Sequence, residues 1–213
     1  QYNQLTEKDL AFLEAIVGQD RAFTGEAISH DYGKDELGTV SRMPDIVLQV
    51  TSALEVQKVM QFAYANKIPV TVRGSGTGLV GACVPIFGGI VLDMDKMNRI
   101  LELDEENMCL TVEPGVLLMD IYEYVEPKGY FYAPDPGEKT ATIGGNIATN
   151  AGGMRAVRYG VTRDWVQALE VVLPNGEVVE LGRKVVKNAT GYSLLDLIIG
   201  SEGTLGIITK AVL

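Results

Sequence analysis

The chain has 213 residues, of which 46% are hydrophobic and 22% are charged, so it can bury one large core or two smaller ones. Its formal net charge of −10 argues against nucleic acid as a main partner, because phosphate backbones are bound by basic surfaces. The two cysteines, Cys83 and Cys109, lack a C-x-x-C spacing, which argues against a disulfide framework or a zinc ribbon, so we expect both to be small buried hydrophobic residues and expect no metal site.

The N-terminal part predicts a helix and then an irregular segment. Thr6 begins the helix, whose apolar residues follow at helical spacing, and Gly18 ends it. Residues 24–43 are polar and irregular, and we expect them at the surface. We therefore treat residues 1–37 as an N-terminal helical and irregular segment that precedes a domain over residues 38–213.

A βαβ unit opens that domain. A strand over residues 46–50 is followed by the capping box Ser52–Glu55, a helix that ends near Lys67, and a strand over 68–72. Two strands joined through a helix in this way must run parallel.

The later elements are mainly hairpins, which makes the expected fold α+β with two subdomains. They comprise a strand over 90–94, a hairpin over 100–103 and 108–112, a helix over 116–125, a hairpin over 168–173 and 177–181, a helix over 193–199 and a strand over 207–213. We place the break between the subdomains near residues 127–133. The last strand has no turn or polar tail after it, so we expect the sequence to be part of a longer protein.

The first glycine-rich stretch, Val72–Ala82, follows a predicted strand and contains G-x-G-x-x-G over Gly76–Gly81. That pattern suggests an NAD site, which requires a helix to open at the third glycine. Pro85 and Gly88-Gly89 leave too little chain for such a helix before the strand at Ile90. Two interpretations of the loop stay open: its N–H groups form an anion-binding nest, or its glycines only make turns.

A second glycine-rich stretch lies at residues 140–153 and contains no charged residue. It carries two glycine pairs and small polar side chains at Asn146, Thr149 and Asn150. Backbone and side-chain hydrogen bonds at close range suit a flat ring with polar edges, which favours a ligand over a set of turns.

Four ordered blocks carry a resemblance to a known family: "PVTVRGSGTGLVGACVP", "GGIVLDMDKMNRI", "ATIGGNIATNAGGMRAVRYG" and "NATGYSLLDLIIGSEGTLGIIT". Over residues 38–213 the chain resembles the PCMH-type FAD-binding domain of the vanillyl-alcohol-oxidase flavoproteins. Within that family it is most similar to the group that contains the D subunit of glycolate oxidase and FAD-linked D-lactate dehydrogenase. The resemblance implies two α+β subdomains with FAD between them.

The resemblance also implies the residues that contact FAD. The pyrophosphate loop would be Arg73, Gly74, Ser75, Gly76, Thr77 and Gly78. The pyrophosphate and flavin would be lined by Pro134, Asp135, Thr140, Ile143, Gly144, Gly145, Asn146, Thr149, Asn150, Gly152, Tyr159 and Gly160. The adenosine end would be lined by Glu202, Gly203, Gly206 and Ile207. For Thr140 and Glu202, a simple loop hydrogen bond is the alternative.

Some relatives attach FAD covalently through a histidine in the pyrophosphate loop, where this sequence has Thr77, so we expect non-covalent FAD. The only histidine, His30, lies far upstream, and we expect it at the surface rather than as a base. The acidic residues Asp93 and Asp95 are interpreted as solvated strand ends.

The resemblance implies oxidation of glycolate or D-lactate, with hydride transfer from substrate C2 to flavin N5. A base and a carboxylate-binding group are then needed, and we find no candidates, so no catalytic residue is assigned. In the family these groups belong to a C-terminal substrate domain, which we expect to be absent here, so we expect the fragment to be inactive alone.

The alternatives are an NAD-binding dehydrogenase domain, a non-catalytic interaction or electron-transfer module, and a peptidoglycan-precursor reductase of the same fold. Expected partners are the small 2-hydroxy acid and, from the resemblance, iron–sulfur subunits or electron-transferring flavoprotein. No apolar run reaches the roughly 18 residues of a membrane span. We expect a cytoplasmic location, with peripheral membrane attachment through partner subunits as a further option.

Overall fold

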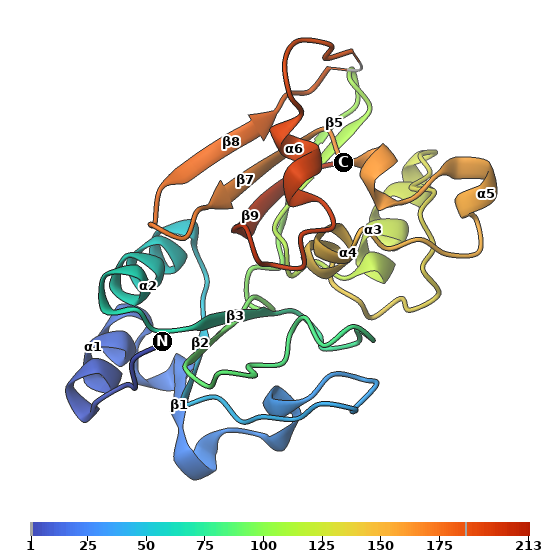
Figure 1. The fold of residues 1–213 in the computed structure, drawn as a ribbon. Coiled ribbons are helices and arrows are strands. Elements are labelled where there is room, and N and C mark those ends of the chain that lie inside the picture. Colours follow the sequence, from blue (N-terminus) through green and yellow to red (C-terminus); the bar gives the residue numbers. More distant parts are fainter. Residues whose placement is uncertain (1, 186) are drawn as a thin grey trace.

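The computed structural model describes residues 2–185 and 187–213. Within these residues the strands form two sheets, each with its own helices, and Figure 1 shows the two resulting lobes. The α+β class predicted from the sequence is confirmed. None of the helices in the described ranges has both the length and the apolar character needed to cross a bilayer.

The first lobe is built on a mostly parallel sheet with strand order β1-β2-β4-β3. Its elements are α1 (Glu7–Val17), β1 (Ala22–Thr24), β2 (Ile46–Gln49), α2 (Ala53–Asn66), β3 (Val70–Arg73) and β4 (Ile90–Asp93). Strands β2 and β3 both run parallel to β4, which lies between them, and β1 pairs antiparallel with β2. The predicted βαβ unit therefore forms, with a third parallel strand inserted between its two strands.

The strands of this sheet are apolar on both faces because both faces are covered. Ile46 and Leu48 pack on one side with residues of α1 and α2. Val47, on the other side, packs with Ile28 and Val91. Ser52 caps α2 as expected, although the Glu55 carboxylate binds Arg21 at 2.7 Å and the Thr51 N–H instead of closing a full capping box.

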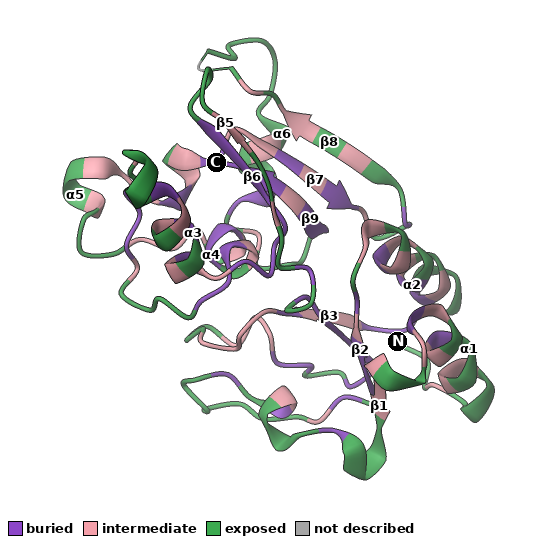
Figure 2. Ribbon diagram, turned by 180° about the vertical axis from the view of Figure 1, so that it is seen from behind, coloured by how far each residue is buried: buried purple, intermediate pink, exposed green. Residues whose placement is uncertain are grey.

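The second lobe is built on an antiparallel sheet with strand order β5-β6-β9-β7-β8. Its elements are β5 (Ile100–Asp104), β6 (Cys109–Val112), α3 (Leu118–Val125), α4 (Ile143–Thr149), α5 (Ala156–Tyr159), β7 (Ala168–Val172), β8 (Val178–Gly182), α6 (Leu194–Ile198) and β9 (Ile207–Val212). Both predicted hairpins form, and β9 joins them by pairing with β6 and with β7. Figure 2 shows buried residues along the inner strands β6, β7 and β9, whereas the residues of the edge strands β5 and β8 are half-buried or exposed.

The boundary between the lobes differs from the predicted one. The first hairpin and α3 belong to the second lobe, so the two sheets divide between β4 and β5 and not near residues 127–133. The physical reason is the pairing of β6 with β9, a contact between distant segments that local patterns do not reveal. The N-terminal segment also belongs to the first lobe, because β1 pairs with β2 and α1 contributes Leu13 and Val17 to the core.

The lobes meet where the β7–β8 turn packs on α2. The side-chain amide of Gln57 donates to the carbonyl of Gly176 over 2.9 Å. Gly176 adopts φ +86°, which favours glycine, and a Cβ there would lie 2.3 Å from Cγ of Gln61 and would displace that side chain. Val172 and Ile207 add second-lobe side chains to the first-lobe core, which fixes one side of the space between the lobes.

Candidate functional site

A cavity of about 350 Å³ lies between the two lobes. Three chain segments supply most of its wall: the glycine loop after β3, the tract that contains α4, and the loop between α6 and β9. Its volume is in the range of small-molecule sites in proteins. The sequence predicted that the two glycine stretches share one crevice, and both line this cavity.

The glycine loop that lines the cavity carries a run of backbone donors without partners. Among the described residues, the backbone N–H groups of Gly74, Ser75, Gly76, Thr77 and Gly78 have no partner, although all five residues line the cavity. A run of free N–H groups in a glycine-rich turn is a nest that suits a phosphate.

Arg73 supports this loop from behind. Its guanidinium donates to the carbonyl of Lys34 over 2.7 Å and to the Cys83 sulfur over 3.4 Å, and the residue is only 8% exposed. Gly76 adopts φ +75°, and a Cβ there would lie 2.0 Å from the Arg73 guanidinium. Arg73 is therefore not among the lining residues, and it packs beneath the loop as an anchor with a positive charge.

The second tract forms a helix whose first N–H groups are already used. Thr142 caps α4, and its hydroxyl accepts from the Gly145 N–H at 3.3 Å. The N–H groups of Ile143 and Gly144 donate to carbonyls of Val116 and Pro114, each over 2.8 Å. This backbone was expected to offer hydrogen bonds to a ligand, but the start of α4 has no spare N–H donor and contributes a closely packed wall instead.

Asn146 is the polar side chain that α4 adds to the cavity. The residue is 5% exposed, and its amide makes no hydrogen bond to another side chain or to the backbone of the described residues. Its amide atoms are not among the described polar atoms that are fully buried without a partner, so they stay accessible to water or to a ligand in the cavity.

The two glycine stretches are in direct contact. The Ser75 hydroxyl donates to the carbonyl of Thr140 over 2.7 Å. A Cβ at Gly74 would lie 2.1 Å from the Thr142 hydroxyl oxygen, so glycine is required for the loop to approach the cap of α4.

The loop between α6 and β9 closes the third side of the cavity. It is fixed on α4, because the N–H groups of Gly200 and Glu202 donate to carbonyls of Ile147 and Ala148 over 3.0 and 2.8 Å. Glu202 adopts φ +55°, a conformation that non-glycine residues rarely hold and that is common at binding sites.

The charges around the cavity are unusual for an anion site. No lysine or arginine of residues 2–185 and 187–213 lines it, whereas the carboxylates of Asp35, Glu138 and Glu202 do. Attraction for a phosphate therefore has to come from backbone N–H groups, with Arg73 behind them. Apolar residues such as Met94, Ile198 and Ile208 cover the rest of the wall and suit a flat ring.

Many predicted site residues line the cavity. These are Gly74, Ser75, Gly76, Thr77, Gly78, Gly144, Gly145, Asn146, Thr149, Glu202, Gly203, Gly206 and Ile207. Their contact with a ligand stays a prediction.

The other predicted residues are not among the lining residues, and several have structural partners. The Asn150 side chain accepts from the Arg163 N–H at 2.9 Å. Asp135 pairs with Arg155 at 3.4 Å. The carbonyl of Tyr159 accepts from the Trp165 indole at 2.9 Å. The remaining predicted residues outside the wall are Arg73, Pro134, Thr140, Ile143, Gly152 and Gly160.

For four of these residues the structure gives a specific reason. The side chain of Ile143 is fully buried in the second-lobe core. Gly160 adopts φ +81°, which favours glycine, and a Cβ there would lie 2.1 Å from the Asp164 carboxylate. The carbonyl of Pro134 accepts from the Tyr122 hydroxyl, and Thr140 donates to Glu138. Thr140 thus makes the local loop hydrogen bond that was its alternative interpretation.

Sequence reasoning missed several wall residues. Asp35, which comes before the glycine loop in the chain, and Cys83, which comes after it, line the cavity, and Thr142 lines it from the cap of α4. Thr142 could have been found as the cap of a helix that begins at Ile143, but no local pattern marks Asp35. Cys83 is half-buried rather than fully buried, whereas Cys109 is buried as expected, and both thiols are free.

The NAD fingerprint is not supported by the structure. Residues 79–88 form turns and bends with no helix, and β4 begins at Ile90. The pattern Gly76–Gly81 therefore lacks the helix N-terminus that would receive a pyrophosphate in that fold.

Two single-residue expectations have clear outcomes. His30 is exposed, as expected. Asp93 is not a solvated strand end: it is 2% exposed and accepts from the Tyr32 hydroxyl at 2.6 Å and from the Gln49 amide at 3.1 Å. It ends β4, which lies between β2 and β3, so neighbouring strands and the Tyr32 side chain cover it.

Sequence comparison identifies relatives of the chain. A family model described as "FAD binding domain" matches residues 44–182. The chain is 50% identical to a D-lactate dehydrogenase of Anaerostipes hadrus, with all of this chain and 45% of that protein aligned. It is 47% identical to glycolate oxidase subunit GlcD of Bacillus subtilis, over 85% of this chain and 39% of that protein. The chain thus spans less than half the length of these relatives.

Comparison with solved structures shows that the chain shares its fold with part of a larger protein. All of the chain superposes on 44% of a solved alkyldihydroxyacetonephosphate synthase, with a TM-score of 0.81 and 26% sequence identity.

Proposed function

This chain belongs to the FAD binding domain family, and from that premise we propose that it holds FAD in the cavity between its lobes, as the flavin-binding part of a D-2-hydroxy-acid oxidoreductase. Family membership identifies FAD as the cofactor. The substrate class and the residues that contact FAD are proposals.

The observation that carries the proposal is the run of free N–H groups over Gly74–Gly78 in a cavity whose described lining residues include no lysine or arginine. The pyrophosphate of FAD would lie against these donors. The Asn146 side chain would contact the polar edge of the flavin ring, and the glycines of α4 and the apolar wall would cover its faces. The donors and the wall therefore fit the cofactor of the family.

We propose that FAD is bound without a covalent link. Thr77 stands in the glycine loop at the position where some relatives carry the linking histidine. The hydroxyl of Thr77 is a poor nucleophile at neutral pH, and the exposed His30 is not among the cavity residues.

Bound flavin supplies a two-electron acceptor for the oxidation of a 2-hydroxy acid to a 2-oxo acid. The residues of this chain would bind and orient the cofactor and exclude water from it. We propose that the base for the substrate hydroxyl and the group that binds its carboxylate come from sequence outside these 213 residues. D-lactate and glycolate are the candidate substrates, because similar proteins are named for them.

We also propose that the whole protein passes electrons to a partner. One relative is named as a subunit of glycolate oxidase. An iron–sulfur subunit or electron-transferring flavoprotein is the kind of partner that would accept electrons from flavin. A partner subunit that is itself bound to a membrane would place the protein at the membrane surface.

The test is a titration of the refolded 213-residue chain with FAD and, separately, with NAD. We expect FAD fluorescence to change on binding and the thermal midpoint to rise, since a ligand at 100 times its Kd stabilises by about 2.7 kcal/mol. NAD should produce neither effect. A preparation that takes up no FAD, or that is stabilised by NAD instead, would contradict the proposal. The same chain should not turn over D-lactate or glycolate.

A further inference from the structure

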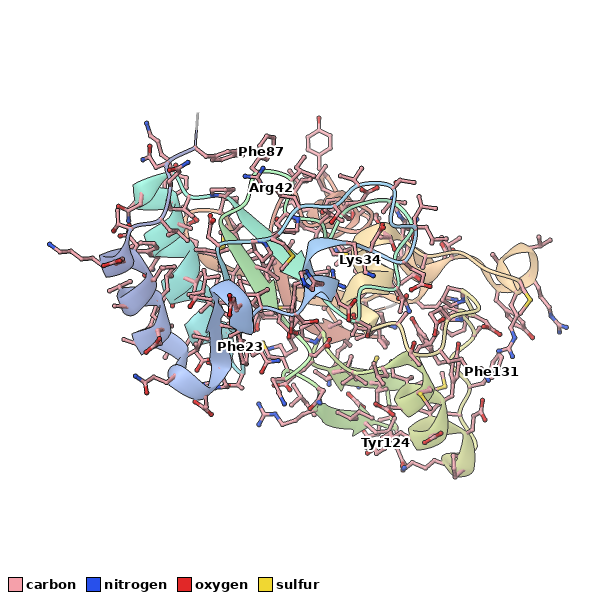
Figure 3. All side chains as sticks on the ribbon, turned by 90° about the horizontal axis from the view of Figure 1, so that it is seen from below. Phe23, Lys34, Arg42, Phe87, Tyr124 and Phe131 are labelled. Atoms are coloured by element: carbon pink, nitrogen blue, oxygen red, sulfur yellow. The ribbon has the colours of Figure 1, made fainter. Side chains whose placement is uncertain are left out.

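The segment just before residue 38 makes close contacts with the glycine loop. Lys34, Asp35 and Glu36 follow the 3₁₀ turn His30–Gly33, before residue 44, where the match to the family model begins. Figure 3 labels Lys34, from which this segment can be followed on the first lobe. Sequence reasoning treated it as an exposed N-terminal piece, yet Asp35 is only 6% exposed.

Each of the three residues fixes a different point of the loop. The carbonyl of Lys34 accepts from the Arg73 guanidinium at 2.7 Å, where the loop begins. The N–H of Glu36 donates to the carbonyl of Gly78 over 3.2 Å, in the middle. The carboxylate of Asp35 accepts from the N–H of Gly81 at 2.8 Å, where the loop ends.

The Asp35 carboxylate is bound on both oxygens. Its second oxygen accepts from the N–H of Gly38 at 3.0 Å, which closes a turn in the segment itself. Burial raises the pKa of Asp35, but hydrogen bonds from backbone N–H groups outweigh it, so the pKa lies below its usual value. Asp35 is therefore ionised at neutral pH and bridges two backbones.

The contacts of residues 34–36 involve some backbone groups of the glycine loop and leave others without a partner. The segment uses the carbonyl of Gly78 and the N–H of Gly81, whereas the N–H groups of Gly74–Gly78 are left without a partner among the described residues. A flexible glycine loop would lose conformational entropy on binding a phosphate, and a loop held in advance loses less.

We propose that Asp35 is a positioning residue of the FAD site, which holds the glycine loop in its binding conformation through the Gly81 N–H. The proposal rests on the proposed function. It runs against simple electrostatics, since a carboxylate in the wall of an anion site repels the anion. A positioning role and a charge role thus predict opposite effects when the charge is removed.

The experiment compares Asp35→Asn with Glu36→Gln in FAD titrations of the 213-residue chain. Both substitutions remove one negative charge from the same segment, but Glu36 contacts the loop only through its backbone N–H. In Asp35→Asn the side chain keeps one acceptor oxygen, and its second oxygen is replaced by an NH2 group that cannot accept a hydrogen bond. One of the N–H groups of Gly38 and Gly81 therefore loses its partner. We expect the Kd of Asp35→Asn to rise about tenfold, equal to 1.4 kcal/mol, and that of Glu36→Gln to stay within about twofold.

A Kd for Asp35→Asn that stays the same or falls would overturn the proposal. A general loss of stability is separated from positioning by measuring the folded fraction of each variant and by restoring the carboxylate in Asp35→Glu, which should recover part of the affinity.

Amide hydrogen exchange of the unsubstituted chain keeps the proposal testable if Asp35→Asn fails to fold. The Gly81 amide should exchange more slowly than the Gly76 amide without FAD, and equal rates would contradict the proposal. If the chain binds no FAD but the Gly81 amide exchanges slowly, the proposed function fails, whereas the hydrogen bond by which Asp35 holds the loop is supported.

Discussion

The two glycine-rich stretches have similar compositions but do different things. In the loop over Gly74–Gly78 the backbone N–H groups are free of partners among the described residues. In α4 the N–H groups of Ile143 and Gly144 are bonded to carbonyls of the second lobe. Both stretches line one cavity, but among the described residues the free backbone N–H groups belong to the loop, whereas the second stretch offers the side-chain amide of Asn146.

The comparison shows that a glycine can serve a ligand or serve packing, and that the neighbours decide which. Gly144 is needed because a Cβ there would lie 2.7 Å from the Pro114 ring and 3.0 Å from its carbonyl. Gly78 has nothing within 4 Å of such a Cβ. A side chain at the first position would damage the fold, whereas one at the second would meet only a bound ligand.

The largest effect is expected for Gly144→Ala, which tests the packing role. The new methyl group meets the rigid ring of Pro114, and overpacking of this kind costs about 1–3 kcal/mol. We expect the free energy of unfolding without FAD to fall by about 2 kcal/mol in urea denaturation. Gly145→Ala in the same helix is the control and should stay within about 1 kcal/mol, because alanine favours a helix. Equal losses in both variants would break the comparison.

Gly76→Ala should affect stability and binding together. The residue has φ +75°, which costs an L-residue roughly 1–2 kcal/mol, and its Cβ would collide with Arg73. We expect FAD affinity to fall at least about tenfold, because the nest is distorted. Gly25→Ala has a similar backbone strain far from the cavity and should lower the thermal midpoint without changing the Kd. An unchanged Kd in Gly76→Ala would show that the loop does not bind the phosphates.

Gly78→Ala sharpens the comparison most cleanly. A Cβ at Gly78 would have no atom within 4 Å, and Gly78 does not have a left-handed φ. The substitution should therefore leave the thermal midpoint of the FAD-free chain unchanged. A ligand against the loop would meet the methyl group, so we expect the Kd to rise by a factor of about three or more. A Kd equal to that of the unsubstituted chain would place the ligand away from this part of the loop.

The smallest effect is expected for Ser75→Ala, which removes the hydrogen bond between the two stretches. A hydrogen bond of this kind contributes about 0.5–1.5 kcal/mol, and the exposed position favours the lower end. Urea denaturation should show a loss of about 0.5 kcal/mol. Ser41→Ala, at an exposed serine without a hydrogen bond among the described residues, is the control. A loss larger than that of Gly144→Ala would reverse the order of importance of the two stretches.

The sequence by itself determined the local elements and the family. Periodic apolar residues and caps specified α1 and α2, and turn residues specified both hairpins, because these depend on neighbours along the chain. The order of the glycine-rich blocks identified the FAD-binding fold, and both stretches proved to line one cavity.

Only the tertiary structure decided where the lobes divide and what each polar group does. The β6–β9 pairing moved the first hairpin into the second lobe. The burial of Asp93, the position of Arg73 beneath the loop and the contact of Asp35 with Gly81 all depend on segments distant in sequence. A local pattern records which hydrogen-bonding groups a residue has, but their partners depend on which strands and loops pack together.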